Sequence, residues 1–233
     1  MSRRRIVVKE ALAYLRTAAY ASSATATLGL EGGRASAPGL FLVHGVGATP
    51  GQFKHLAAAL APDVAFVDHF DYRSTRPLDE IIGALVAAIS RRSTSHEPGV
   101  VVVGHSLGGL LLRIILQSDH PPPRVRAFVS ICAPLGGTTR CALAPSKDLR
   151  SITPGAELFV RLANTEHRLE ALRGRVLAVG SWRDHFVEPK ESAFLSGARA
   201  LELHDAGHVA SLFDRRVHEA VRALVFEAER ATD

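Results

Sequence analysis

The sequence predicts an α/β fold, in which helices flank both faces of a mostly parallel central sheet of about six strands. Two observations carry this prediction. The first is that short runs such as residues 100–103 are almost continuously apolar, and the second is that these runs alternate along the chain with longer segments of helical character. Strands that are apolar on both faces are typical of parallel sheets covered by helices. The chain has 233 residues, 47% of them hydrophobic, which is enough for one domain with a large core.

The expected elements follow one another regularly. We expect strands at residues 40–44, 64–72, 100–103, 125–131, 176–180 and 198–203. We expect helices at residues 52–60, 78–92, 110–116, within 156–172, and at 209–228. Gly32, Gly33 and Pro38 interrupt the pattern before the first strand, because glycine and proline mark loops. We therefore divide the chain into an N-terminal segment, 1–36, and a single domain, 37–233, with a short cap segment at about 133–174.

The N-terminal segment has two interpretations, which its sequence leaves open. Arg4 and Arg5 ahead of apolar residues are similar to a twin-arginine export signal, with small residues for cleavage at 24–26. However, Glu10 and Arg16 interrupt the apolar stretch. Val8, Leu12, Leu15 and Ala19 instead share one face at helical spacing. An amphipathic helix, packed on the domain or lying on a membrane surface, explains the segment equally well, so we expect a cytoplasmic, a peripherally membrane-associated or an exported protein.

Charge and cysteine content exclude several classes of partner. The net charge is +5, but the arginines are mostly scattered, so we expect no nucleic-acid groove. Cys132 and Cys141 are too few for a disulfide framework, and two free buried thiols are favoured over a bridge between them. No His/Asp/Glu cluster has metal-ligand spacing, and no phosphate-binding glycine loop follows the first strand. We therefore expect neither a metal nor a cofactor.

A serine between glycines is the strongest functional motif. Residues 104–109 read Gly-His-Ser-Leu-Gly-Gly, directly after a predicted strand and before a predicted helix. A sharp strand-to-helix turn of this kind holds the serine hydroxyl out at the end of the sheet, and it needs glycine where the backbone approaches closely. The motif therefore predicts Ser106 as a catalytic nucleophile.

The partners that a serine nucleophile needs follow later in the chain, each after a predicted strand. An imidazole must accept the serine proton, and a carboxylate must orient that imidazole. Asp184 and His208 occupy such positions, so we predict Asp184 as the orienting acid and His208 as the general base. Asp205 is a rival acid that we expect to cap the following helix instead, and Glu188 is a weaker rival. We expect His105 to pack beside the turn, and His55, His96, His120 and His218 to lie at the surface.

The loop after the first strand is expected to supply a backbone N–H group that stabilises the reaction intermediate. Backbone N–H groups that are fixed in advance stabilise the negative charge of an acyl-transfer intermediate. We assign this role to the amides of Leu107, directly after the nucleophile, and of Val46, in the loop that follows the first strand. The residues that we expect to bind substrate, in an open and mainly apolar cleft, are His44, Gly45, Phe53, Leu135 and Phe186. For Phe53 and Phe186, burial in the core is an equally good interpretation.

Taken together, these motifs resemble bacterial lipases and esterases of the α/β-hydrolase superfamily, of the compact triacylglycerol-lipase type. The resemblance runs from about residue 40 to 225 and includes residues 42–45, the box at 104–109, residues 133–138, Asp184 with Val187 and Pro189, and Gly207-His208. It implies an α/β-hydrolase fold with a small cap, and hydrolysis of a carboxylic ester or lipid through an acyl-enzyme. Ala133 and Leu135 depart from the family's usual threonine and histidine. A thioesterase, lactonase, amidase or acyltransferase remains an alternative on the same residues, and a non-catalytic hydrolase-like binding protein is a remote one.

Overall fold

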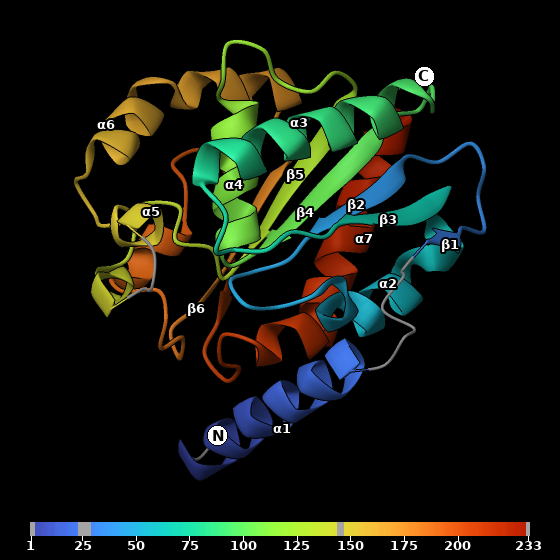
Figure 1. Ribbon diagram of the computed structural model, residues 1–233. Coiled ribbons are helices and arrows are strands. Elements are labelled where there is room, and N and C mark those ends of the chain that lie inside the picture. The colour runs from blue at the N-terminus through green and yellow to red at the C-terminus, as the bar shows by residue number, and fades with distance from the viewer. Residues whose placement is uncertain (1–2, 23–28, 144–146, 232–233) are drawn as a thin grey trace.

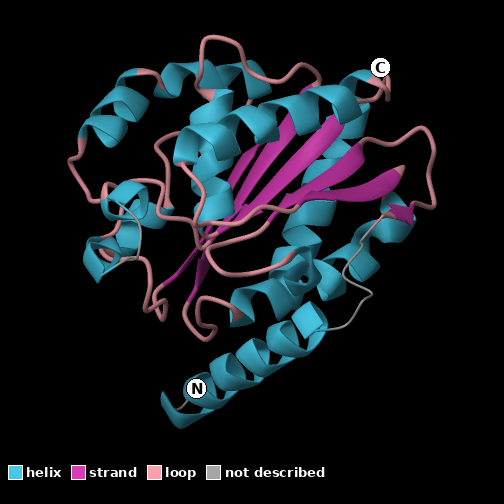
Figure 2. Ribbon diagram, viewed as in Figure 1, coloured by secondary structure: helices cyan, strands magenta, loops and turns pink. Residues whose placement is uncertain are grey.

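The computed structural model describes residues 3–22, 29–143 and 147–231, and these form a seven-stranded sheet between helices (Figures 1 and 2). The strand order is β1-β3-β2-β4-β5-β6-β7. All neighbouring strands run parallel except β1, which is antiparallel to β3. The strands are β1 (Leu30–Glu31), β2 (Gly39–Val43), β3 (Phe66–Phe70), β4 (Val100–His105), β5 (Val125–Ile131), β6 (Val176–Ser181) and β7 (Arg199–Leu203).

Helices cover both faces of this sheet. The longer α-helices are α1 (Arg3–Ser22), α2 (Lys54–Leu60), α3 (Leu78–Thr94), α4 (Leu107–Leu116), α6 (Glu157–Asn164) and α7 (Arg215–Arg230). One core lies between the sheet and α2 and α7, and a second lies between the sheet and α3, α4 and α6. Figure 1 shows α3 and α4 in front of the strands, with α7 behind them. The three-layer α/β fold that the sequence predicts is confirmed.

Strand β4 shows why the strands read as continuous apolar runs. Val101 and Val103 point into the core beneath α2 and α7, whereas Val100 and Val102 point into the core beneath α3 and α4. Successive side chains of a strand alternate between faces, and both faces are covered here, so residues 100–103 are apolar without interruption. The polar residue of β4, His105, stands at its carboxyl end.

The structure refines several expected elements. Strand β1 was not expected; its two residues are too few to show a periodic pattern. The expected helix at 52–60 is divided into the 3₁₀ helix η1 (Pro50–Phe53) and α2, and the one at 209–228 into η6 (Ala210–Phe213) and α7. The segment that we expect to form the cap, residues 133–174, contains η3 (Thr139–Leu143), α5 (Lys147–Arg150), α6 and η4 (Glu166–Leu172). The small residues at 24–26, expected as a cleavage site, lie outside the described residues.

Within the N-terminal segment, residues 3–22 form helix α1, which lies at one end of the molecule, beyond the sheet layers (Figure 1). It packs against η1 and η6, and the side chains of Ile6 and Ala13 are buried. Val7, Val8, Leu12 and Leu15 remain exposed. Within the part of the chain that the structure describes, no helix is long and apolar enough to cross a membrane.

Candidate active site

Ser106 lies in the sharp turn between β4 and α4, with a positive φ of 54° and a ψ of −125°. Such a conformation costs about 1–3 kcal/mol for a residue with a side chain, and it clusters at functional sites. The turn is held by hydrogen bonds from the backbone N–H of Ser106 to the Ile131 carbonyl (3.0 Å) and from that of Gly109 to the Ser106 carbonyl (3.0 Å). Ser106 is thus presented at the carboxyl end of β4.

The glycines of the turn are required by close backbone contacts. A Cβ on Gly104 would lie 2.4 Å from the backbone nitrogen of Gly109, and one on Gly108 would lie 2.1 Å from the carbonyl oxygen of Val43. Both distances are far inside van der Waals contact, and both neighbours are backbone atoms that cannot turn aside. The glycine spacing of the motif is therefore a steric requirement of packing α4 onto β2 and β4.

Asp184 and His208 form a buried pair beyond the ends of β6 and β7. Oδ2 of Asp184 lies 2.7 Å from Nδ1 of His208, and Oδ1 accepts hydrogen bonds from the backbone N–H groups of Phe186 (2.7 Å) and Val187 (3.1 Å). Burial raises the pKa of Asp184, but the charge and hydrogen bond of His208 and the two backbone N–H groups outweigh it and hold that pKa below its ordinary value. Asp184 therefore remains an anion beside the imidazole.

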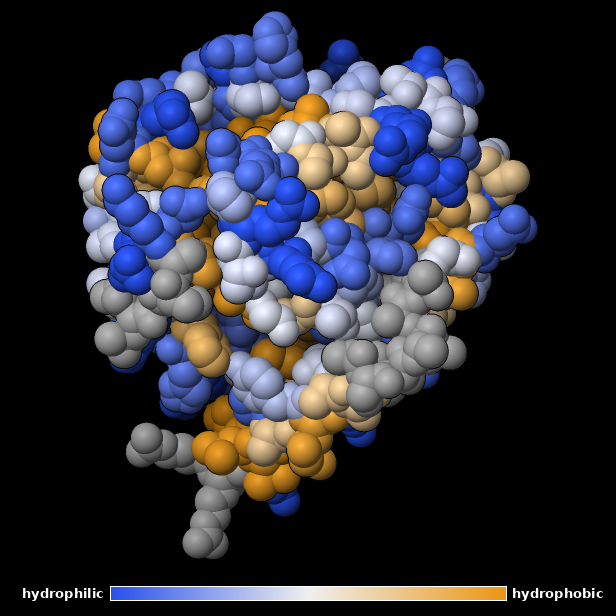
Figure 3. Space-filling view, in the orientation of Figure 1, coloured by the Kyte–Doolittle hydropathy of each residue, from blue (hydrophilic) through white to orange (hydrophobic). Residues whose placement is uncertain are grey.

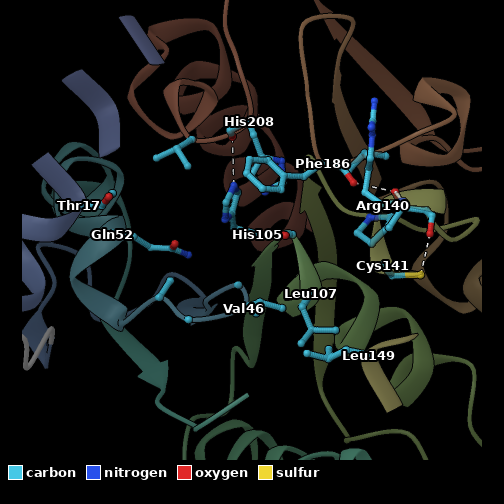
Figure 4. Close-up of a pocket in the computed structure, with 18 of the residues that line it drawn as sticks. Thr17, Val46, Gln52, His105, Leu107, Arg140, Cys141, Leu149, Phe186 and His208 are labelled. Atoms are coloured by element: carbon cyan, nitrogen blue, oxygen red, sulfur yellow. Dashed lines mark hydrogen bonds between the residues drawn. The ribbon is translucent and has the colours of Figure 1, made fainter. Parts of the chain in front are cut away.

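Ser106 and His208 line the same pocket. His105 also lines it and lies beside His208 (Figure 4). The ring of His105 lies 4.7 Å from that of His208, between centroids, and its Nε2 lies 3.2 Å from the His208 carbonyl oxygen. Burial, followed by the charge of His208, lowers the pKa of His105 to about 3. A neutral His105 donates its Nε2–H to that carbonyl, so His105 packs beside the turn, as expected, and supports the backbone of His208.

The rival acids have other partners. Asp205 and Arg216 form an ion pair on the surface, and Glu188 pairs with Lys190. The expectation that Asp205 caps the following helix is wrong, because the N-cap of α7 is Asp214, whose side chain accepts from the Arg216 N–H at 2.9 Å.

The other histidines divide into two groups. His55 and His120 are exposed, as expected. His96 and His218 are half-buried instead, and each bonds a backbone carbonyl at 2.8 Å.

The backbone amides of Val46 and Leu107 are available at the pocket. Leu107 is the first residue of α4, and the first N–H groups of a helix have no carbonyl partner within it. Val46 follows β2 in a turn whose next amide, that of Gly47, bonds the Ser74 hydroxyl at 3.1 Å. Among the described residues, no hydrogen bond uses the amide of Val46 or Leu107. Both residues line the pocket beside Ser106.

The pocket itself is a mainly apolar cavity of about 560 Å³. Of the residues expected to bind substrate, Gly45 and Phe186 line it. Phe53 does not, because η1 turns its ring into the core with α2. Leu135 also lies in the core, and its carbonyl accepts from buried Arg113 at 2.6 Å.

His44 is the third expected residue that the structure keeps out of the pocket. It is buried, its ring stacks on that of Tyr72 with centroids 4.4 Å apart, and its carbonyl accepts from the Tyr72 hydroxyl at 2.8 Å. Burial lowers the pKa of His44. Its position directly before Gly45 and Val46 makes it a support of the loop that carries the Val46 amide.

Several pocket residues were missed by the sequence analysis. Helix α1 contributes Tyr14, Thr17 and Ala18, and the cap contributes Arg140, Cys141, Leu149 and Ile152. The rings of Tyr14 and Phe186, which both line the pocket, lie beside each other with their centroids 6.4 Å apart. The apolar periodicity of α1 predicted a helix, but nothing in it showed which part of the domain the helix would contact.

The two cysteines are free and buried. Among the described residues, one group of three could in principle hold a metal ion: Cys132, Asp184 and His208. Each already has another partner, because Asp184 and His208 bond each other and the Cys132 thiol donates to the Ser211 hydroxyl at 3.4 Å. Burial raises the pKa of the Cys132 thiol, which disfavours the thiolate that a metal needs.

A family model described as palmitoyl protein thioesterase matches residues 40–195, which include most of β2, the serine turn and Asp184. The chain belongs to this family. No curated protein matches it in sequence. As a palmitoyl protein thioesterase family member, it shares the α/β-hydrolase fold with solved lipases and esterases, so the resemblance drawn from the motifs is confirmed.

Three of these solved structures cover nearly the same share of the chain. The mature lipase BlEst2 of Bacillus licheniformis has a TM-score of 0.70 at 14% identity and covers 84% of this chain and 95% of its own. The esterase domain of a Rhodothermus marinus protein has a TM-score of 0.58 at 21% identity, over 84% and 87%. The Paleococcus ferrophilus monoacylglycerol lipase has a TM-score of 0.54 at 17% identity, over 83% and 96%. At these identities the likeness shows the fold.

Proposed function

We propose that this protein is a serine hydrolase that cleaves carboxylic esters of apolar acyl chains through an acyl-enzyme. The observation that carries the proposal is the buried Asp184–His208 hydrogen bond of 2.7 Å, beside a pocket that Ser106 also lines. The family match and the fold of the structural neighbours support cleavage of an ester bond. We also propose that the chain consists of an N-terminal segment, residues 1–36, and a single hydrolase domain, residues 37–233.

Each proposed step follows from the position of one group. His208 accepts the proton of the Ser106 hydroxyl at Nε2 as Oγ attacks the acyl carbonyl, and it gives that proton to the leaving oxygen as the ester bond breaks. Water then attacks the acyl-enzyme with the same help, which releases the acid and restores Ser106. Asp184 accepts from Nδ1–H throughout, so that Nε2 is the nitrogen left to accept the serine proton.

Two backbone amides are proposed to stabilise the oxyanion. The N–H groups of Val46 and Leu107 lie at the pocket, and the described residues provide neither with another acceptor. Losing one donor of this kind typically costs about 10²–10³ in rate. Because the donors are backbone groups, the side chains at these two positions are free to shape the pocket.

A thioester is the second candidate substrate, and the family match favours it specifically. The chemistry at Ser106 is the same for both, since only the leaving atom changes from oxygen to sulfur. The mainly apolar cavity of about 560 Å³ suits an acyl chain in either case.

Peripheral membrane contact through α1 is a further part of the proposal. Val8, Leu12 and Leu15 point away from the body of the molecule, and Leu15 is 67% exposed. Figure 3 shows apolar side chains gathered at the end of the molecule where α1 lies. Arg5, Lys9 and Arg16 follow one flank of the helix by its periodicity, and apolar faces beside cations suit an anionic lipid surface.

One structural neighbour supports the membrane proposal. A solved membrane phospholipase A, with a TM-score of 0.54 at 15% identity, covers 96% of this chain and 92% of its own. Because this match covers 96% of the chain, it includes most of residues 1–36. Cosedimentation with anionic and with neutral vesicles tests the contact. We expect binding to anionic vesicles that a Leu12→Asp, Leu15→Asp variant loses, and equal recovery in the supernatant for both proteins would contradict it.

Hydrolysis of p-nitrophenyl esters with two to sixteen acyl carbons, and of the matching thioesters, tests the proposed activity. Wild type is compared with Ser106→Ala, which removes one hydroxyl and should keep the fold. We expect turnover in wild type and a loss of at least about 10⁴-fold in the variant. A higher kcat/KM for thioesters would select the second candidate. A folded wild type without activity on either series would contradict both.

A further inference from the structure

The loop that carries His208 is held by the body of the domain on one side. The Ala206 carbonyl accepts from the Ser181 hydroxyl at 2.5 Å, and the His208 carbonyl accepts from the Ser211 hydroxyl at 2.7 Å. His105 lies on the same carbonyl at 3.2 Å. These contacts fix the carbonyl groups of the loop and leave its amides to be satisfied elsewhere.

The amides that follow His208 bond a carboxylate of the N-terminal helix. Oε1 of Glu10 accepts from the Val209 N–H at 2.9 Å, and Oε2 accepts from the Ala210 N–H at 3.0 Å. A Cβ on Gly207 would lie only 2.2 Å from Oε2 of Glu10. The absence of a side chain at position 207 is what lets this loop approach α1 so closely.

These two amides need an acceptor from outside their own helix. They stand at the start of η6, where the first N–H groups have no carbonyl partner. Val209 and Ala210 are both buried, and an unsatisfied buried donor costs about 1–3 kcal/mol. Glu10 satisfies both with one charged group, and hydrogen bonds to a charged acceptor are stronger than those between neutral groups.

Glu10 is itself held in place by the packing of α1. Ile6, Glu10, Ala13 and Thr17 share one face of the helix by their spacing. Ile6 and Ala13 are buried, and Ala13 belongs to the core shared with α2 and α7. The next flank carries Tyr14 and Ala18 into the pocket. The helix is therefore fixed on both sides of Glu10, so the carboxylate has a defined position.

We propose that Glu10 is a positioning residue for His208: by clamping the Val209 and Ala210 amides, it holds the imidazole where it can serve Ser106. This proposal rests on the proposed function. Glu10 is not among the pocket-lining residues, so it acts through the loop and not through the substrate. The N-terminal segment thereby becomes part of the catalytic machinery of the domain.

The test compares Glu10→Ala, Glu10→Gln and a matched control, Glu227→Ala. The control also removes a carboxylate together with its hydrogen bond, which Glu227 of the far helix α7 accepts from Arg199 at 2.7 Å. Measurements are kcat and KM for a short p-nitrophenyl ester, the melting temperature, and hydrogen exchange of the 207–213 amides. For Glu10→Ala we expect kcat to fall roughly 10- to 100-fold, an unchanged KM, and faster exchange at Val209 and Ala210.

The conservative variant separates positioning from a general loss of structure. The amide oxygen of Glu10→Gln still accepts one N–H, so we expect its kcat to lie between those of wild type and Glu10→Ala, whereas Glu227→Ala should match wild type. A kcat within twofold of wild type for Glu10→Ala overturns the proposal. The proposal is also overturned if Glu10→Gln loses as much kcat as Glu10→Ala while the Val209 and Ala210 amides still exchange slowly.

The role of Glu10 can be tested even if the proposed function is wrong. If wild type hydrolyses no ester or thioester, amide exchange still reports on the clamp: faster exchange of the Val209 and Ala210 amides in Glu10→Ala supports it, and unchanged exchange overturns it. Failure of the proposed function is seen in wild type alone, and failure of the clamp is seen only in the Glu10 variants.

Discussion

Replacement of Asp184 by asparagine is the most informative perturbation of the site. Oδ1 of Asp184 accepts two backbone N–H groups, from Phe186 and Val187. In Asp184→Asn, the position of Oδ1 must stay an oxygen, because an amide NH₂ there would face two donors. The NH₂ is then forced into the position of Oδ2, 2.7 Å from Nδ1 of His208.

This forced orientation inverts the tautomer of His208. An NH₂ facing Nδ1 requires Nδ1 to accept, so the ring proton moves to Nε2, which then cannot take the proton of Ser106. A catalytic base held in the wrong tautomer costs about 10⁴ in kcat, or about 5 kcal/mol of transition-state stabilisation at 1.36 kcal/mol per decade. We expect this loss in kcat for a p-nitrophenyl ester, with little change in KM.

Asp205→Asn is the matched control, because Asp205 is only three residues from His208 but is half-exposed and pairs with Arg216. We expect it to keep wild-type kcat. More than a tenth of wild-type kcat in Asp184→Asn would refute the reasoning, as would an equal loss in Asp205→Asn.

Three further predictions follow from other parts of the structure. The pKa of about 3 for buried His105 lies below its ordinary value, so only the unfolded chain takes up this proton as the pH falls below about 6.5. Urea unfolding should show a loss of roughly 2 kcal/mol between pH 7 and pH 5, and His105→Gln should lack this contribution. Gly108→Ala places a Cβ 2.1 Å from the Val43 carbonyl oxygen, so it should lower the free energy of unfolding by about 3 kcal/mol. As a control, Gly83→Ala on α3 places its Cβ in open space and should raise the free energy of unfolding by up to about 1 kcal/mol. Equal effects of the two substitutions would contradict the steric argument. Ala18→Trp narrows the pocket and should lower kcat/KM for long acyl chains relative to short ones, by about fourfold for each CH₂ group excluded; an unchanged ratio would show that α1 does not limit the acyl chain.

Local sequence patterns were sufficient to predict the fold and to indicate that Ser106, Asp184 and His208 follow one another at the ends of strands. The turn around Ser106 could be predicted because the glycine spacing that it requires falls within residues 104–109, although one of the contacts that impose this spacing is with the Val43 carbonyl of β2. Asp184 and His208 could be placed because parallel strands bring their carboxyl ends to one edge of the sheet. Strand β1 was missed because two residues show no period.

The pocket was less predictable because its walls depend on orientation. Phe53 and Phe186 look alike in the sequence, yet η1 turns one into the core and the loop after β6 leaves the other half-exposed. In the sequence, Glu10 is only a charged residue that interrupts an apolar helical pattern, so its contact with the loop of His208 could not be predicted. Its partners lie 199 and 200 residues further along the chain, and no periodicity connects positions so far apart.

The central claim is that Ser106 is the nucleophile of this protein, and covalent labelling tests it most directly. A fluorophosphonate with an alkyl chain reacts with a serine that a neighbouring base activates. We predict one adduct in the intact mass of the wild-type protein, located by peptide mapping on Ser106 and absent from Ser106→Ala. A folded wild type that stays unlabelled, or an adduct that persists in Ser106→Ala, would contradict the account.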